Sequence, residues 1–368
     1  MPLFDFKRRK AAVALVKAAR VRGMSVEDYA KTLSPAELAQ YVPQDKKPEA
    51  PKVEMPDVAL WGLPPDSAVT AAKFIADARL AEAVTAYRDG DWQPGAALLA
   101  DLGTDWDRRA HAVQQLGDVA ADDEGPLKAW RESGSADAAT VHAQGLVALA
   151  WQIRTSFTPE HVSEDQWAGF FRVLEEAETA TRAATEAAPE DPTPWWTMLT
   201  VARGRQYEND DFRAVWAELV ARDPLHRQGH EQALQYWCAK WFGSHEQMFA
   251  FADEAVAKAP KLAGLGLVAA HEAEDKKVEA WKSDRTGRAL DVVLPWLAGE
   301  DQDHPANLRD RAYAAKVLVV NGRCDEAVEQ FKALGVHADA LIWAYGGNGR
   351  EHEFKKTRYL ACYGATRP

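Results

Sequence analysis

The chain of 368 residues contains only three cysteines, Cys238, Cys324 and Cys362, which lie far apart and form no CxxC pair. Such a small, odd number argues against a disulfide framework and favours a reducing compartment. No apolar run approaches the roughly 20 residues that a membrane-spanning helix needs, and 27% of the residues are charged. We therefore expect a cytoplasmic protein without a transmembrane segment.

Basic residues are in the minority, because 44 lysines and arginines face 56 aspartates and glutamates, which leaves a net charge of −12. Phosphate backbones bind to a surplus of positive charge, so nucleic acid is not expected as the main partner. Apolar residues make up 47% of the chain. This fraction excludes general disorder, and the length is sufficient for a large core.

Alternating runs of Val, Ile and Thr, which would predict β-strands, are scarce. Ala, Leu, Glu and Arg dominate instead, and these residues favour helices. Turn signals such as Asp89-Gly90 and Ser133-Gly134 interrupt the helical stretches at short intervals. The sequence therefore predicts an all-α protein with many short helices.

Three regions of the chain differ in composition. Residues 1–42 predict a short, separate helical segment, in which Ser25 and Asp28 resemble a helix-capping pair. Residues 43–60 are rich in Pro, Lys and Glu, lack apolar periodicity and predict a linker. The α-helical repeat body is expected to span residues 61–368.

The body contains an internal repeat. Pro189, Pro224 and Pro260 follow predicted helices at intervals of 35 and 36 residues, and apolar residues precede each proline along one helical face. Recurring helix pairs of this length predict stacked helical hairpins, clearest over about residues 170–335. The clearest apolar sets are Phe212, Val215, Trp216, Leu219 and Val220, then Met248, Phe251, Ala252, Ala255 and Val256, while Met198, Val201 and Ala202 match Leu234, Trp237 and Cys238 in the preceding helices.

The last repeat carries a family resemblance. Its turn glycine, Gly322, is followed by the small residue Ala327 and, four residues later, by the large aromatic Phe331. This pattern resembles the tetratricopeptide repeat, and residues 236–249 are similar to a hairpin in bacterial helical-repeat proteins of unknown function. The resemblance implies a right-handed α-solenoid that binds a peptide or protein. Several second helices lack the family's usual alanine, so the repeats are degenerate.

Aromatic side chains concentrate in the central repeats, which hold several of the 14 tryptophans. Trp216 and Trp237 belong to the apolar stripes and are expected to pack between helices. Three other tryptophans fit the stripes less well and have arginines nearby, and exposed aromatics beside arginine are typical of interface hot spots. The predicted partner-binding residues are Trp195, Trp196, Arg203, Arg205 and Trp241.

A second hypothesis is a metal-dependent or otherwise catalytic protein that uses His226 and His230. Two histidines four residues apart on a helix can share a Zn²⁺ ion, with a third ligand from His245 or Cys238. The residues around His226 place it at the start of the helix, however, which works against a shared face. The pair also lacks the intervening glutamate of a metalloprotease helix. We therefore expect neither a catalytic centre nor a cofactor.

The N-terminal segment is basic and has only a small apolar face. A third hypothesis is therefore a peripheral adaptor that contacts anionic lipid or an acidic partner through residues 1–22. A solvated helix and a helix docked on the acidic body are the alternatives. The apolar stretch before Lys17 is too short for a signal peptide. The basic residues are Lys7, Arg8, Arg9, Lys10, Lys17, Arg20 and Arg22.

Of the three hypotheses, the sequence favours the first, a non-catalytic scaffold or adaptor. Its partner is expected to be a protein or peptide that binds on the surface of the helical repeats. The support is partly negative, because none of the candidate catalytic patterns is complete.

Overall fold

The computed structural model describes residues 15, 16, 18, 19, 22–34, 37, 56–155, 161–275, 278–299 and 304–367. The chain divides into two compact units, residues 1–55 and residues 56–368. The described residues form sixteen α-helices and no β-strand, which confirms the all-α prediction. None of the described helices is both long enough and apolar enough to cross a membrane.

In the N-terminal unit, the clearest element is helix α2 (Val26–Thr32). The side chain of Ser25 caps this helix by accepting a hydrogen bond from the backbone N–H of Asp28 at 3.1 Å, as the sequence predicts. Most of the linker predicted over residues 43–60 lies outside the described residues. Its last residues belong to the second unit, where a short 3₁₀ helix, η2 (Val58–Trp61), begins the body.

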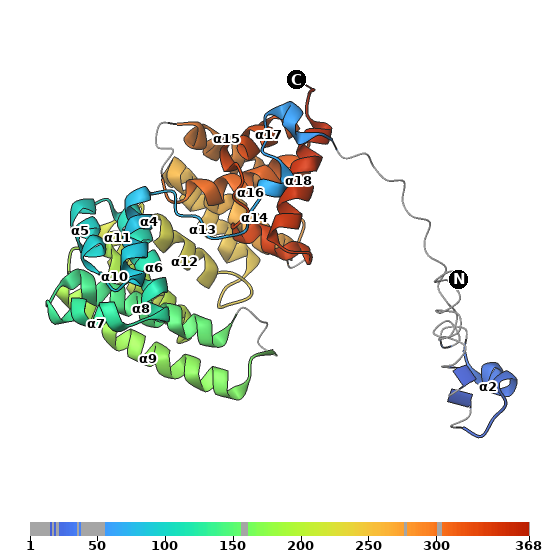
Figure 1. Ribbon diagram of the computed structural model, residues 1–368, viewed down its shortest axis with the longest axis horizontal. Coiled ribbons are helices and arrows are strands. Elements are labelled where there is room, and N and C mark those ends of the chain that lie inside the picture. Colours follow the sequence, from blue (N-terminus) through green and yellow to red (C-terminus); the bar gives the residue numbers. More distant parts are fainter. Residues whose placement is uncertain are drawn as a thin grey trace. The chain divides into compact units, whose positions relative to one another are not determined.

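The body is built from helices that pack mainly against their neighbours in the sequence, so hairpins are its basic unit. Figure 1 shows α4 to α11 gathered in one part of the body and α14 to α18 in another. The helices are α4 (Ala78–Arg88), α5 (Gln93–Leu102), α6 (Trp106–Asp122), α7 (Gly125–Glu132), α8 (Ala136–Arg154), α9 (Glu164–Ala187), α10 (Pro192–Gly204), α11 (Asn209–Arg222), α12 (Arg227–Tyr236), α13 (His245–Lys258), α14 (Gly264–Asp275), α15 (Asp284–Ala298), α16 (Asn307–Val320), α17 (Cys324–Leu334) and α18 (Arg350–Gly364), with further 3₁₀ turns η3 (Asp66–Ala68), η5 (Pro260–Leu262) and η6 (Leu341–Gly346).

The prolines of the repeat end their helices as predicted. Helices α9, α11 and α13 each stop two residues before Pro189, Pro224 and Pro260. Proline disfavours the helical conformation of the residue before it and offers no N–H, so it fixes a boundary from local sequence alone. The apolar face before each proline is buried at its centre, for example at Phe212 and Met248.

The prediction was wrong at the end of α12. The phase of the repeat extends this helix through Trp237 and Cys238, but it stops at Tyr236. A compact turn follows, in which Gly243 N–H donates to the carbonyl of Cys238 at 3.3 Å. A Cβ at Gly243 would lie 2.1 Å from the carbonyl oxygen of Trp237, so only glycine permits this close approach of two backbone segments.

Two large hydrophobic clusters form the core of the body. One joins α4 to α8 with α10 to α12, and the other joins α12 to α18 with the first residues of the body. Trp61 donates its indole N–H to the carbonyl of Thr366 at 3.2 Å, and Thr70 pairs with His337 in a single parallel bridge. The start of the body therefore packs against its last helices before the chain crosses to α4.

Helix α14 begins at Gly264 against the carboxylate of Asp310, which comes from α16. A Cβ at Gly264 would lie 2.3 Å from Cγ of Asp310. Asp310 is fully buried and is held by Arg227 at 2.7 Å, so it has no room to withdraw. Glycine at this position allows the N-terminus of the helix, which favours negative charge, to approach the carboxylate.

The contact at Gly264 predicts opposite effects for two glycine substitutions. Gly264→Ala is expected to lower the free energy of unfolding by about 1 to 3 kcal/mol, the usual cost of overpacking. Gly287→Ala is the control, because a Cβ there meets nothing within 4 Å, and the better helix former should stabilise the protein by about 0.5 to 1 kcal/mol. Urea unfolding measures both, and equal stability of the two variants would contradict the packing.

Candidate functional site

Three adjoining cavities form a continuous depression in the body, here called the inner groove. Their volumes are about 180, 70 and 460 Å³. The first and second share His111, His304 and Arg309 in their walls. The second and third share Trp196 and Gln232, so the groove runs from the segment before α4 to the ends of α8 and α10.

Polar side chains at helical spacing line the third and largest cavity. Gln144 and Gln152 lie eight residues apart on α8, and Gln114 and Asp118 lie four residues apart on α6. Each pair therefore faces the same side of its helix. The residues of α10 that line this cavity also share one side of their helix, because Trp196, Thr200 and Arg203 follow the spacing i, i+4, i+7.

Several buried polar atoms of the groove make no hydrogen bond with any other part of the described chain. Trp196 is only 2% exposed, yet its indole N–H has no acceptor. The side-chain oxygens of Gln228 and Gln232 accept no hydrogen bond from a described residue. The Nε–H of Arg203 likewise has no acceptor there. A buried polar group without a partner costs about 1 to 3 kcal/mol. These atoms are therefore suited to hydrogen bonds with a bound molecule.

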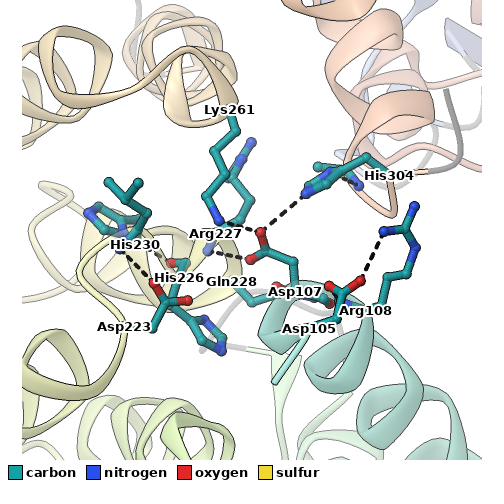
Figure 2. A network of polar contacts seen from close by, with 12 residues as sticks. Asp105, Asp107, Arg108, Asp223, His226, Arg227, Gln228, His230, Lys261 and His304 are labelled. Atoms are coloured by element: carbon teal, nitrogen blue, oxygen red, sulfur yellow. Dashed lines mark hydrogen bonds and ion pairs between the residues drawn. The ribbon is translucent and has the colours of Figure 1, made fainter. Parts of the chain in front are cut away.

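A buried carboxylate, that of Asp107, holds the wall between the first two cavities in place (Figure 2). Asp107 lies in the first turn of α6 and accepts hydrogen bonds from Nζ of Lys261 at 2.5 Å, Nε2 of His304 at 3.2 Å and the backbone N–H of Arg227 at 2.9 Å. His304 must carry its proton on Nε2, because its Nδ1 accepts from the backbone of Ala306. Four separate segments therefore meet at one side chain.

Electrostatics keep this carboxylate ionised. Burial by itself would raise the pKa of Asp107, but the hydrogen bond from His304 and the positive charge of Lys261 outweigh it and hold the pKa well below its usual range. A folded-state pKa below the unfolded value means that the contribution to stability is present above about pH 4 and is lost as the pH falls further.

Replacement of Asp107 tests how much of the groove depends on it. Asp107→Asn leaves the ammonium of Lys261 half-buried without its charge partner, so the free energy of unfolding should fall by about 3 to 5 kcal/mol. The double variant Asp107→Asn with Lys261→Met should recover part of this loss, because neither charge is then left alone. Urea midpoints of the wild type, of Asp107→Asn, of Lys261→Met and of the double variant decide the matter. Two losses that simply add would contradict the pairing.

The two candidate metal ligands serve local structural roles. His226 is the N-cap of α12, as the sequence suggests, and its Nδ1 accepts from the backbone N–H of Gly229 at 3.0 Å. His230 donates from Nδ1 to the carbonyl of His226 at 2.9 Å. Cys238, one of the two candidates for a third ligand, contacts the carbonyl of Leu234. Within the described residues, no three His, Cys, Asp or Glu side chains are grouped to hold a metal ion.

Burial of His230 predicts a dependence of stability on acid. Burial lowers its pKa to about 4, so between pH 6.5 and 4 the unfolded chain binds a proton that the folded chain excludes. Stability therefore falls as the pH falls through this range. His230→Gln should lose about 2 kcal/mol less than the wild type between pH 7 and 4.5, as measured by urea unfolding. The control is His352→Gln on the exposed surface of α18, which should keep the wild-type pH dependence.

The predicted partner-binding residues do not share one surface. Trp196 and Arg203 line the inner groove. The guanidinium of Arg203 lies over the ring of Trp241, which is not part of the groove wall. The expected exposure of Trp196 was wrong, because α6 and α8 cover it. Trp195 instead lines a separate cavity of about 470 Å³. Arg205 forms an ion pair with Glu178 on α9 at 3.1 Å.

The two tryptophans assigned to packing are only half-buried, but both pack against other aromatic rings. Trp216 meets His230 edge to face at a centroid distance of 4.9 Å, and Trp237 meets Tyr236 in the same way at 4.9 Å.

The sequence analysis missed the glutamines of the groove. Gln144 and Gln152 lie eight residues apart on α8, and Gln228 and Gln232 lie four residues apart on α12. This helical spacing is a signal that could have identified them.

The basic residues Lys7, Arg8, Arg9, Lys10, Lys17 and Arg20 lie outside the described residues. Arg22, the remaining member of this set, is exposed. It donates to the hydroxyl of Tyr29 and lies 4.9 Å from the centre of the same ring. The contact is local to the N-terminal unit, and the lipid-binding hypothesis stays a prediction.

Comparisons of the chain with protein-family models, curated proteins and solved structures find no match.

Proposed function

We propose that this protein is a non-catalytic scaffold whose inner groove binds an extended segment of a protein partner. The body would then be a right-handed, tetratricopeptide-like solenoid in which the first helices of successive hairpins form the binding wall. The observation that carries the proposal is the set of buried polar atoms in the groove without partners among the described residues, including the indole N–H of Trp196 and the side-chain oxygen of Gln232.

The chemistry of the groove suits a peptide backbone. An extended peptide presents one N–H donor and one C=O acceptor per residue, and a glutamine side chain can pair with either. Gln114, Gln144, Gln152 and Gln232 are spread over α6, α8 and α12 around the largest cavity. Amides in such an array recognise main-chain groups without demanding one particular side chain. A long, open, amide-lined depression also fits a peptide better than it fits a compact ligand.

A pair of alanine substitutions tests the location of binding. Ala148 lines the largest cavity of the inner groove, whereas Ala214 lines the separate cavity beside Trp195. Peptides selected on the full chain from a displayed library of random dodecapeptides are resynthesised and titrated by calorimetry. They should bind the wild type and Ala214→Trp equally, and bind Ala148→Trp about ten-fold or more weakly because the indole fills the groove.

Circular dichroism and thermal unfolding establish that both variants are folded before the titrations are compared. Selected peptides that bind Ala148→Trp as well as they bind the wild type would overturn the proposed site. A library that yields no binding peptide at all would argue against peptide recognition by this protein.

A further inference from the structure

Two arginines and three tryptophans alternate at the end of the inner groove. Arg203 lies over the rings of Trp151 and Trp241, with its guanidinium carbon 5.2 Å and 5.0 Å from their centres. The two rings stand at 83° to each other, so Arg203 occupies the corner between them. Arg154 also lies over Trp151, at 5.5 Å, and over Trp167, at 5.3 Å. These five residues are called the arginine–tryptophan ladder.

The ladder arginines differ from the other arginines that lie over aromatic rings in the described part of the body. Four of those have a carboxylate partner: Arg213 with Asp210, Arg222 with Glu218, Arg285 with Asp253 and Arg358 with Asp66. Neither Arg154 nor Arg203 forms an ion pair with any described residue. Both therefore carry a positive charge that no carboxylate among the described residues balances in an ion pair.

The surroundings of Arg203 make this charge costly. Burial is the main cause that lowers its pKa to about 10, and the nearby Arg154 lowers it further. The carboxylate that affects the pKa of Arg203, that of Glu272, already forms an ion pair with Lys240 at 2.6 Å. Since the folded state holds the charged form less well than the unfolded chain does, Arg203 destabilises the free protein at neutral pH. An anion that binds beside it would remove that cost.

We propose that the arginine–tryptophan ladder binds an acidic side chain of the peptide held in the inner groove. Arg203 lines the largest cavity of the inner groove, so the carboxylate would lie at the end of the bound segment nearest to the ends of α8 and α10. The proposal rests on the proposed function and adds to it the chemical class of the partner, a segment that carries Asp or Glu. The buried Nε–H of Arg203, which has no acceptor in the described chain, offers one hydrogen bond to that carboxylate.

The geometry favours a carboxylate over a more highly charged group. The Nε–H of Arg203 has no acceptor among the described residues, and a guanidinium presents its N–H groups in the planar fork that a carboxylate accepts with paired hydrogen bonds. Asp118 lies in the wall of the same cavity, and the chain has a net charge of −12, so a polyanion such as a nucleic acid would be repelled. A ligand with a single negative charge is attracted by the ladder arginines and is repelled least by Asp118 and the net negative charge of the chain.

Three fluorescein-labelled dodecapeptides test the proposal by fluorescence anisotropy with the full chain. They share one neutral sequence and differ at a single position, which carries Glu, Gln or phosphoserine. The Glu peptide should bind about ten-fold more tightly than the Gln peptide, which is the usual effect of one charge-assisted hydrogen-bond pair. Arg203→Met should reduce binding of the Glu peptide to the level of the Gln peptide, and Arg203→Lys should give an intermediate value.

Arg213→Met is the matched control, because Arg213 also lies over a tryptophan but is paired with a carboxylate. It should leave binding unchanged. A second readout separates recognition from packing: free Arg203→Met should melt at or above the wild-type temperature, and the Glu peptide should raise the melting temperature of the wild type only. If Arg203 only stabilised the fold, Arg203→Met would melt below the wild-type temperature, and the Glu peptide would not distinguish the two proteins.

Equal binding of the Glu and Gln peptides, or wild-type binding by Arg203→Met, would overturn the acidic preference. Tighter binding of the phosphoserine peptide than of the Glu peptide would overturn the choice of carboxylate. These failures differ from failure of the proposed function. If library peptides lose affinity for Ala148→Trp but not for Arg203→Met, the groove binds peptides without acidic recognition.

Discussion

The carboxylate of Asp107 is the interaction on which the arrangement of the inner groove depends. It joins the first turn of α6 to Arg227 at the start of α12, to Lys261 after α13 and to His304 before α16. Hydrophobic contacts between neighbouring hairpins would tolerate small changes in the angle between them, whereas a buried charge with three directional partners does not. The polar centre therefore sets the spacing of the helices, and the apolar clusters fill the space that this spacing leaves.

The body treats its buried charges in two ways. Asp107 and Arg109 are each satisfied by partners from distant segments, such as Asp191 for Arg109 at 2.7 Å. Along the groove, in contrast, polar atoms of Trp196, Gln232 and Arg203 are left without protein partners. A folded chain that satisfies most of its interior can carry a few such costs, and those of the inner groove lie where a ligand can remove them.

The local features of the fold could be predicted from the sequence, and the distant contacts could not. Proline acts on its immediate neighbours, so the ends of α9, α11 and α13 follow from Pro189, Pro224 and Pro260. The partners of Asp107 lie 120 to 197 residues away, and no spacing rule connects them. The exposure of Trp196 was predicted from the apolar pattern of its own helix, whereas neighbouring helices determine its burial. Degenerate repeats also hid the early end of α12, because its turn depends on Gly243 and not on the repeat phase.

The packing of residues 58–69 against the last helices has a consequence for how the array can grow or come apart. In an open array, hairpins can be added or lost at either end, and the terminal ones fray first. Here the first segment of the body covers apolar side chains of the final helices, and Trp61 and Thr366 are joined directly. The face of the final helices that this segment covers is therefore closed to another hairpin. Loss of the last helix would uncover the first segment as well. The body should therefore melt in a single cooperative step and behave as a unit of fixed length.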